Sequence, residues 1–176
     1  MTRIQNIVEW VQQTRDAQLT RDIALLVTRI LLAWLFIYHG AGTLFGAFHQ
    51  SGLHGETVYF QSEHLNPAHV FAVIDGTTQF VGGILIGVGI LGRLAGLALV
   101  GDMIGAMATI TFAQGLVGPN GAGYQINVAL IIPSLVIALL GTGRFSLDEL
   151  IGRLWKTRTA SRDRTPLPQA RSSVHP

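Results

Sequence analysis

Four long apolar stretches constrain this chain more than any other feature of its sequence. They run over Ile23–Phe45, Val70–Ile90, Leu94–Val117 and Tyr124–Leu140. A helix needs about 20 apolar residues to cross the roughly 30 Å of hydrocarbon in a bilayer, and the first three stretches reach that length. The fourth is shorter and contains Pro133. We therefore predict an all-α membrane protein whose transmembrane domain is a bundle of four helices.

The composition agrees with helices that lie in lipid. Only 12% of the 176 residues are charged, which is about half of the roughly 25% found in soluble domains. The mean hydropathy is +0.43. The chain contains no cysteine, and this excludes disulfide scaffolds, zinc–thiolate sites, iron–sulfur clusters and thiol catalysis.

The distribution of lysine and arginine predicts how the helices are oriented. Several arginines precede the first stretch, Arg93 lies between the second and the third, and a basic segment follows Leu140. Residues 46–69 and 118–123 contain neither lysine nor arginine. Cytoplasmic loops of membrane proteins are enriched in these two residues. We therefore expect a multi-pass membrane protein with both termini in the cytoplasm.

Short amphipathic helices are expected at both ends of the transmembrane domain, which we assign to residues 23–145. In residues 1–22, apolar side chains recur at helical spacing, and no signal-peptide cleavage site follows. A serine and a glutamate with the spacing of a capping box begin a second interfacial helix over residues 146–156. Residues 157–176 are rich in Arg, Ser and Pro, which predicts a basic, disordered cytoplasmic tail.

Glycines four residues apart recur in the second and third stretches. The pairs are Gly83 and Gly87, Gly92 and Gly96, and Gly101 and Gly105. In lipid, helices associate largely through close backbone contacts, which small residues permit. We expect the second and third helices to pack tightly as a hairpin, and dimerisation through the same glycines is the alternative.

Short motifs at the ends of the stretches resemble those of a known family. The motifs are His39–Gly46 (HGAGTLFG), Gln79–Gly83 (QFVGG), Gly92–Ala95 (GRLA), Gly123–Gln125 (GYQ) and Gly141–Asp148 (GTGRFSLD). Over most of its length the chain resembles the DoxX family of small bacterial membrane proteins. The resemblance implies a four-helix bundle in the bacterial cytoplasmic (inner) membrane. It also implies a relation to the membrane subunit of thiosulfate:quinone oxidoreductase or to membrane-bound oxidative-stress complexes.

Two of the charged residues inside the predicted spans, Arg29 and Asp102, fall nearer the inner side. A charge at membrane depth costs about 2.5–3.5 kcal/mol on insertion and therefore usually faces a partner or a cavity. At about 1.5 Å per residue, Arg29 lies about 9 Å and Asp102 about 12 Å from the inner ends of their helices. We predict an ion pair between them that either fixes helix register or takes part in catalysis.

A second polar layer is expected nearer the outer surface. By the same helical rise, side chains from three different spans fall at about 21–24 Å from the inner side, with one glutamine deeper at about 16 Å. The predicted lining of this layer is His39, Asp75, Gln79 and Asn127, with Tyr124 and Gln125 near its mouth. If these side chains converge, they form an outward-opening polar pocket with apolar walls.

His39 and Asp75 are the candidate catalytic residues of this pocket. Histidine titrates near pH 6.5 and both donates and accepts hydrogen bonds, as a quinone ring or a proton relay requires. The structural alternative is that these side chains only hydrogen-bond neighbouring helices.

Four histidines lie in or beside the outer segment between the first two spans. They are His49, His54, His64 and His69. Imidazole suits zinc, copper or iron, but the intervals match no standard metal motif. We therefore assign no metal site and keep these residues as weak candidates.

Three functions are compatible with this sequence, and whether the chain is an enzyme stays open. The first, implied by the resemblance, is a membrane subunit of a quinone-linked oxidoreductase, with quinone in the polar pocket and electrons supplied by a protein partner. The second is a non-catalytic anchor or assembly subunit of a larger complex. The third is a small-solute or proton-conducting bundle. The expected partners are the lipid bilayer and proteins of a membrane complex. The basic tail lacks interleaved aromatic residues, so no nucleic-acid partner is expected.

Overall fold

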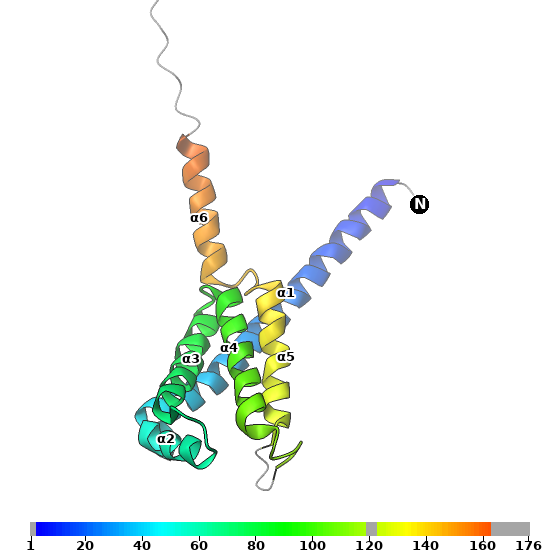
Figure 1. Cartoon of the computed structure of the whole chain (residues 1–176). Helices are drawn as coiled ribbons and strands as arrows, with labels where there is room; N and C mark the ends of the chain where they lie inside the picture. Colours follow the sequence, from blue (N-terminus) through cyan, green and yellow to red (C-terminus); the bar gives the residue numbers. More distant parts are fainter. Residues whose placement is uncertain (1–2, 119–122, 163–176) are drawn as a thin grey trace, which may run out of the picture.

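The computed structural model describes residues 3–118 and 123–162 of the chain (Figure 1). Within them, side chains are described for residues 9, 10, 12–118 and 123–155. The described residues form helices and contain no strand, which confirms the all-α prediction. The elements are α1 (Arg3–Phe45), η1 (Ala47–His49), α2 (Gly52–Ser62), α3 (Ala68–Val88), α4 (Gly92–Ala106), η2 (Met107–Thr111), α5 (Gln125–Leu140) and α6 (Leu147–Arg162).

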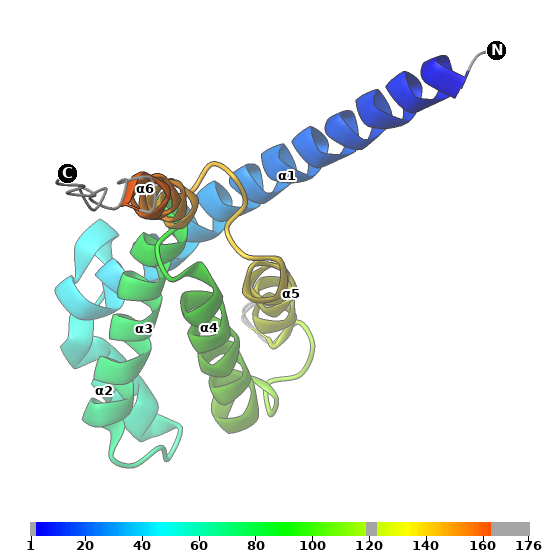
Figure 2. The same cartoon turned by 90° about the horizontal axis from the view of Figure 1, so that it is seen from above.

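Three segments are long and apolar enough to cross a membrane. They are Gln12–Phe45, Ala68–Val88 and Gly92–Thr111. The fourth predicted span, α5, is apolar but has 16 residues and contains Pro133. A helix of this length rises about 24 Å, less than the hydrocarbon thickness. Because α5 runs beside α4 (Figures 1 and 2), it belongs to the bundle, and its crossing of the membrane stays a prediction.

The segment before the first span is part of the same helix as the span. We expected residues 1–22 to form a separate short helix, but α1 is continuous from Arg3 to Phe45. Neither proline nor glycine occurs between Arg3 and His39, so nothing in the sequence ends the helix near residue 22. The first part of α1 extends away from the bundle (Figures 1 and 2). Its interfacial position stays a prediction.

The second terminal helix, α6, begins where the capping box predicts. The backbone N–H of Glu149 donates to Ser146 Oγ at 3.3 Å. The helix continues to Arg162, past the expected end at residue 156, and extends away from the bundle on the same side as the first part of α1 (Figure 1). The rest of the predicted tail, residues 163–176, lies outside the described residues.

We expected the glycines of α3 and α4 to bring these two helices together, but two of them pack closely against other helices. A β-carbon at Gly83 would lie 3.0 Å from the backbone nitrogen of Ile37 on α1, and one at Gly96 would lie 2.8 Å from the carbonyl oxygen of Ser134 on α5. The closest approaches of these glycines are therefore between α3 and α1 and between α4 and α5, rather than within an α3–α4 hairpin. A β-carbon at Gly101 or Gly105 would meet nothing within 4 Å.

Arg29 is almost completely buried and connects three segments of the chain. Its side chain has 1% of its surface exposed. Nε donates to the carbonyl oxygen of Ile86 at 2.9 Å, and Nη2 donates to that of Gly87 at 2.8 Å. Nη1 donates to the carbonyl oxygens of Thr142 at 2.8 Å and Phe145 at 3.0 Å. These bonds tie α1 to the C-terminal end of α3 and to the loop after α5.

The structure does not form the predicted ion pair between Arg29 and Asp102. Arg29 lies level with the turn between α3 and α4, because its partners are at the end of α3. Asp102 is ten residues beyond Gly92, which is about 15 Å further along α4. Our depth for Arg29 was measured from Ile23, but α1 continues past that residue, so apolarity alone misplaced the inner boundary.

Replacing Arg29 with methionine is expected to destabilise the protein strongly, because several carbonyl oxygens lose their only charged donor in an apolar environment. A buried polar group without a partner costs about 1–3 kcal/mol, so the free energy of unfolding should fall by more than about 3 kcal/mol. Thermal unfolding of the detergent-solubilised protein measures this loss. Arg15→Met changes an exposed position of the same helix and serves as the control. Equal unfolding midpoints for the two variants would contradict the role of Arg29.

Candidate functional site

A polar cavity of about 230 Å³ lies between α2 and the bundle. Its polar lining is His39, Thr43, Gln50, Glu56, Tyr59, Asp75, Gln79, Thr111 and Asn127. Its apolar walls include Phe36, Phe60, Met103 and Ile110. The four residues that we expected to converge from three spans, His39, Asp75, Gln79 and Asn127, all line this one cavity.

Two hydrogen-bonded pairs orient the amides in the polar cavity. Gln79 Nε2 donates to Asp75 Oδ1 at 2.8 Å, one turn away on α3. Thr111 Oγ1 donates to Asn127 Oδ1 at 3.0 Å, and Asn127 Nδ2 donates to the carbonyl oxygen of Met103 at 3.4 Å. Gln79 and Asn127 are buried, so their positions are fixed by these bonds and by packing.

A turn of π-helix, η2, contributes part of the cavity wall. The backbone N–H of Phe112 donates to the carbonyl oxygen of Met107, five residues back, at 3.0 Å. A π turn widens the helix and is often found at functional sites. Here Ile110 and Thr111 line the polar cavity from this turn. Residues 107–111 contain no proline or motif from which the turn could be predicted.

Three carboxyl groups form a series through this region. Glu56 of α2 lines the same cavity as Asp75, and Asp102 of α4 lines an adjoining space that Asp75 also lines. Asp102 Oδ2 is buried and has no hydrogen-bond partner among the described residues. We expected Asp102 in a different layer and did not place Glu56 in the polar pocket. Neither was predicted beside Asp75, because both contacts depend on how helices distant in sequence face one another.

A lateral groove of about 320 Å³ lies between α3 and α4 beside the polar cavity. Asp75, Phe60 and Ile110 line both spaces, and Asp102 lines the groove. Gly101 and Gly105 also line it, and neither glycine has a neighbour within 4 Å of a built β-carbon. Exposed groove residues include Ile74 and Thr109, so the groove opens toward the lipid-facing surface.

The residues expected near the mouth lie just outside the cavity lining. The ring of Tyr124 stacks on Phe112 with centroids 5.6 Å apart. The backbone N–H of Gln125 donates to the carbonyl oxygen of Leu116 at 3.1 Å. Both residues stand at the start of α5, close in sequence to Asn127, and they help to fix the beginning of that helix.

The weak metal candidates are not brought together. His69 Nδ1 lies 3.2 Å from Thr57 Oγ1, whereas His49, His54 and His64 are exposed on or beside α2. The described residues contain no group of three or more His, Cys, Asp or Glu residues that could hold a metal ion.

Glu56 differs from an ordinary surface carboxylate. It lies on α2, outside the three candidate spans. Burial raises the pKa of the Glu56 carboxyl above its usual value of 4.5, and the nearby charge of Asp75 raises this pKa further. The folded protein therefore binds the Glu56 proton more tightly than the unfolded chain does, and the free energy of unfolding falls as the pH rises from the unfolded pKa to the folded one.

Replacing Glu56 with glutamine imitates the protonated acid and should remove this loss of stability. We expect Glu56→Gln to unfold at a higher temperature than the wild type above pH 7. The difference should be smaller near pH 4, where the protonated glutamate of the wild type is neutral, as the glutamine is. Differential scanning calorimetry across this pH range measures the effect. Glu63→Gln, at the end of α2 and outside the cavity lining, is the control. The same pH-dependent gain in both variants would contradict a specific effect of the cavity.

Comparison with known proteins identifies the family. The chain matches the DoxX family model over residues 24–114. It is 26% identical to "Putative oxidoreductase CatD" of Bacillus subtilis (strain 168) over 132 residues, which cover 74% of this chain and 88% of that protein. It is 27% identical to "Inner membrane protein YqjF" of Escherichia coli (strain K12) over 136 residues, which cover 76% and 96%.

No solved structure matches the chain. The family match nevertheless covers more than half of its 176 residues. The structure adds several helices that are apolar and long enough to cross a bilayer. This protein is therefore a membrane protein that belongs to the DoxX family.

Proposed function

We propose that this chain is the membrane subunit of a quinone-linked oxidoreductase and that the polar cavity binds the quinone ring. One observation carries the proposal: His39 of α1, Asp75 and Gln79 of α3, and Asn127 of α5 line a single cavity with apolar walls. A similar relative is named as an oxidoreductase, which supports this class of function. The relevant experiment is quinone binding by the purified protein.

The chemistry of the lining suits a quinone. The two carbonyl oxygens of the ring accept hydrogen bonds, and the imidazole of His39 and the amide of Gln79 are donors in the cavity wall. The ring itself needs apolar contacts, which Phe36 and Met103 offer. A cavity of about 150 Å³ holds a benzene ring, so a volume of about 230 Å³ has room for a substituted quinone.

The carboxyl series supports proton exchange with the bound ring. Reduction of a quinone to a quinol consumes two electrons and two protons, and each proton must reach a ring oxygen. His39 and Asp75 line the cavity and are the groups that would exchange protons with the ring. Glu56, on the short helix outside the spans, interacts with Asp75 and would pass protons between Asp75 and water.

The electrons would come from a protein partner. The chain has no cysteine and therefore cannot hold an iron–sulfur cluster or a redox disulfide of its own. In this proposal a second protein carries the redox centre and transfers two electrons to the ring. If quinone did not bind, the second function, an anchor or assembly subunit, would become the better account.

The lateral groove would hold the isoprenoid tail of the quinone. It adjoins the polar cavity along Asp75, Phe60 and Ile110, and its opening faces the lipid-exposed surface. Membrane quinones are confined to the bilayer by their tails, so their entry requires such a lateral opening. Glycines at positions 101 and 105 leave this opening free of side chains.

The proposed orientation follows from the same arrangement. The first part of α1, the α3–α4 turn and α6 lie at one end of the bundle, and α2 lies at the other (Figure 1). Arginines cluster near the first end, which favours a cytoplasmic location for it in the inner membrane. The polar cavity would then lie toward the outer surface.

His39→Ala should weaken binding of a soluble ubiquinone or menaquinone analogue by about tenfold, because the hydrogen bond from the imidazole to a quinone carbonyl oxygen is lost. Calorimetric titration of the purified protein measures this affinity. His54→Ala is the matched control, because His54 is exposed on α2 and does not line the cavity. If His39→Ala binds as tightly as the control, or if the wild type binds no quinone, the proposed site is wrong.

Gly105→Leu should discriminate between quinones by the length of their tails. The added side chain fills open space in the groove, so the fold should tolerate it. We expect the affinity for a decyl-substituted quinone to fall at least fivefold, or about 1 kcal/mol, while a tail-free analogue binds unchanged. Gly152→Leu, which also adds a side chain into open space but on α6, should affect neither ligand. Equal losses for both analogues would show that the groove does not hold the tail.

A further inference from the structure

A second cavity, of about 610 Å³, lies at the opposite end of the bundle from the polar cavity. We name it the arginine pocket. It is bordered by α1, the α3–α4 turn, the loop after α5 and the start of α6. Its charged lining is Arg21, Asp22, Arg93, Arg144, Asp148 and Glu149.

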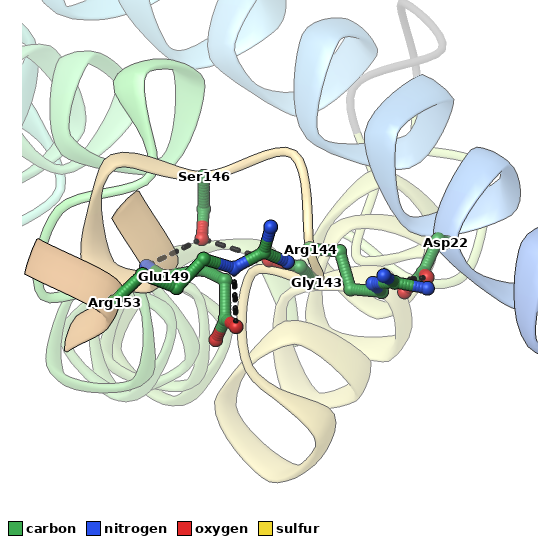
Figure 3. Close-up of polar contacts among 6 residues, drawn as sticks. All are labelled: Asp22, Gly143, Arg144, Ser146, Glu149 and Arg153. Carbon is green, nitrogen blue, oxygen red and sulfur yellow. Dashed lines mark hydrogen bonds and ion pairs between the residues drawn. The ribbon is translucent and has the colours of Figure 1, made fainter. Parts of the chain in front are cut away.

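The carboxylates of the arginine pocket are occupied by partners within the protein. Asp148 Oδ1 accepts a hydrogen bond from the backbone N–H of Leu91 at 3.2 Å. Glu149 Oε1 lies 3.1 Å from Arg153 Nε (Figure 3). The remaining carboxylate, Asp22, lies beside Arg144, with its Oδ2 3.9 Å from Arg144 Nε. Internal contacts therefore offset much of the negative charge of the pocket.

The arginines of the pocket make fewer contacts with other residues than the carboxylates do. Among the contacts of the described residues, Arg21 and Arg93 make neither an ion pair nor a side-chain hydrogen bond. Arg144 Nε lies 3.9 Å from Asp22 Oδ2 (Figure 3), a separation at which no hydrogen bond forms, and 62% of its side chain is exposed. The pocket thus presents guanidinium groups with free donors to a ligand.

Exposed leucines border these arginines. Leu91, Leu94 and Leu140 line the same pocket, and about half or more of each side chain is exposed, at 54%, 63% and 47%. They stand at the ends of helices that belong to the membrane bundle, where lipid headgroups meet acyl chains. A ligand that contacts both the guanidinium groups and these leucines must carry a negative charge and an apolar part.

We propose that the arginine pocket binds the phosphate of an anionic phospholipid, whose acyl chains lie along the three leucines. The planar fork of a guanidinium matches the oxygens of a phosphate, and basic pockets between membrane helices bind anionic headgroups. Free phosphate shares the same polar chemistry but leaves the leucines uncovered. This inference does not depend on quinone binding.

The test is a titration of the full-length protein in detergent, followed by native mass spectrometry. The probes are dioleoylphosphatidylglycerol, dioleoylphosphatidylcholine and inorganic phosphate. We expect one phosphatidylglycerol to bind about tenfold more tightly than phosphatidylcholine, and Arg93→Gln to lower the affinity for phosphatidylglycerol about fivefold. Arg93→Lys keeps the charge but loses the fork, so its affinity should fall between the other two proteins.

Arg171→Gln is the matched control, because it removes the same charge from the basic C-terminal segment. If it weakens phosphatidylglycerol binding as much as Arg93→Gln does, general attraction to the basic segment explains the binding and the pocket proposal is wrong. Equal affinities for the two phospholipids, or displacement of phosphatidylglycerol by equimolar inorganic phosphate, would also overturn it. Should Arg93→Gln fail to fold, Arg21→Gln on the surface of α1 provides the same comparison.

Discussion

The hydrogen bonds between the Arg29 guanidinium and four backbone carbonyls are the interaction on which the rest of the bundle depends. The last carbonyls of a helix have no partner within that helix, and in lipid an unsatisfied carbonyl is costly. One planar cation satisfies carbonyls at the end of α3 and in the loop after α5. From this fixed point α1 runs toward His39, while α3 runs back toward Gln79 and Asp75. The register at one end of the bundle therefore determines which side chains face one another at the other end.

Much of the fold could be predicted because it depends on local or periodic properties. Apolar length indicated the spans, and the capping box gave the start of α6, which Ser146 confirms. The convergence of His39, Asp75 and Asn127 could be anticipated because helical rise is regular, so residues at equal depth on neighbouring helices meet if they face inward. Helical rise gives the depth of a residue, but it does not give the rotation of the helix about its own axis. For this reason Glu56 and Asp102 were not predicted beside Asp75, and the partner of Arg29 was predicted wrongly.

The polar groups at the two ends of the bundle have different surroundings. Around Asp75 the polar groups are held by short contacts and enclosed by aromatic and aliphatic walls, as in a site that orients a small ligand. Around Arg93 the acids have partners within the protein, and the arginines stand beside exposed leucines, as at a surface that meets lipid.

The π turn at Met107–Thr111 has a consequence for the whole helix that contains it. Such a turn accommodates one residue more than a regular α-helix does. Deleting a single residue there would let the helix close into α geometry while the segments on either side keep their orientation, so only the part of the cavity wall formed by Ile110 and Thr111 would change. A homologue one residue shorter in this segment would thus keep the same bundle and have a differently lined chamber.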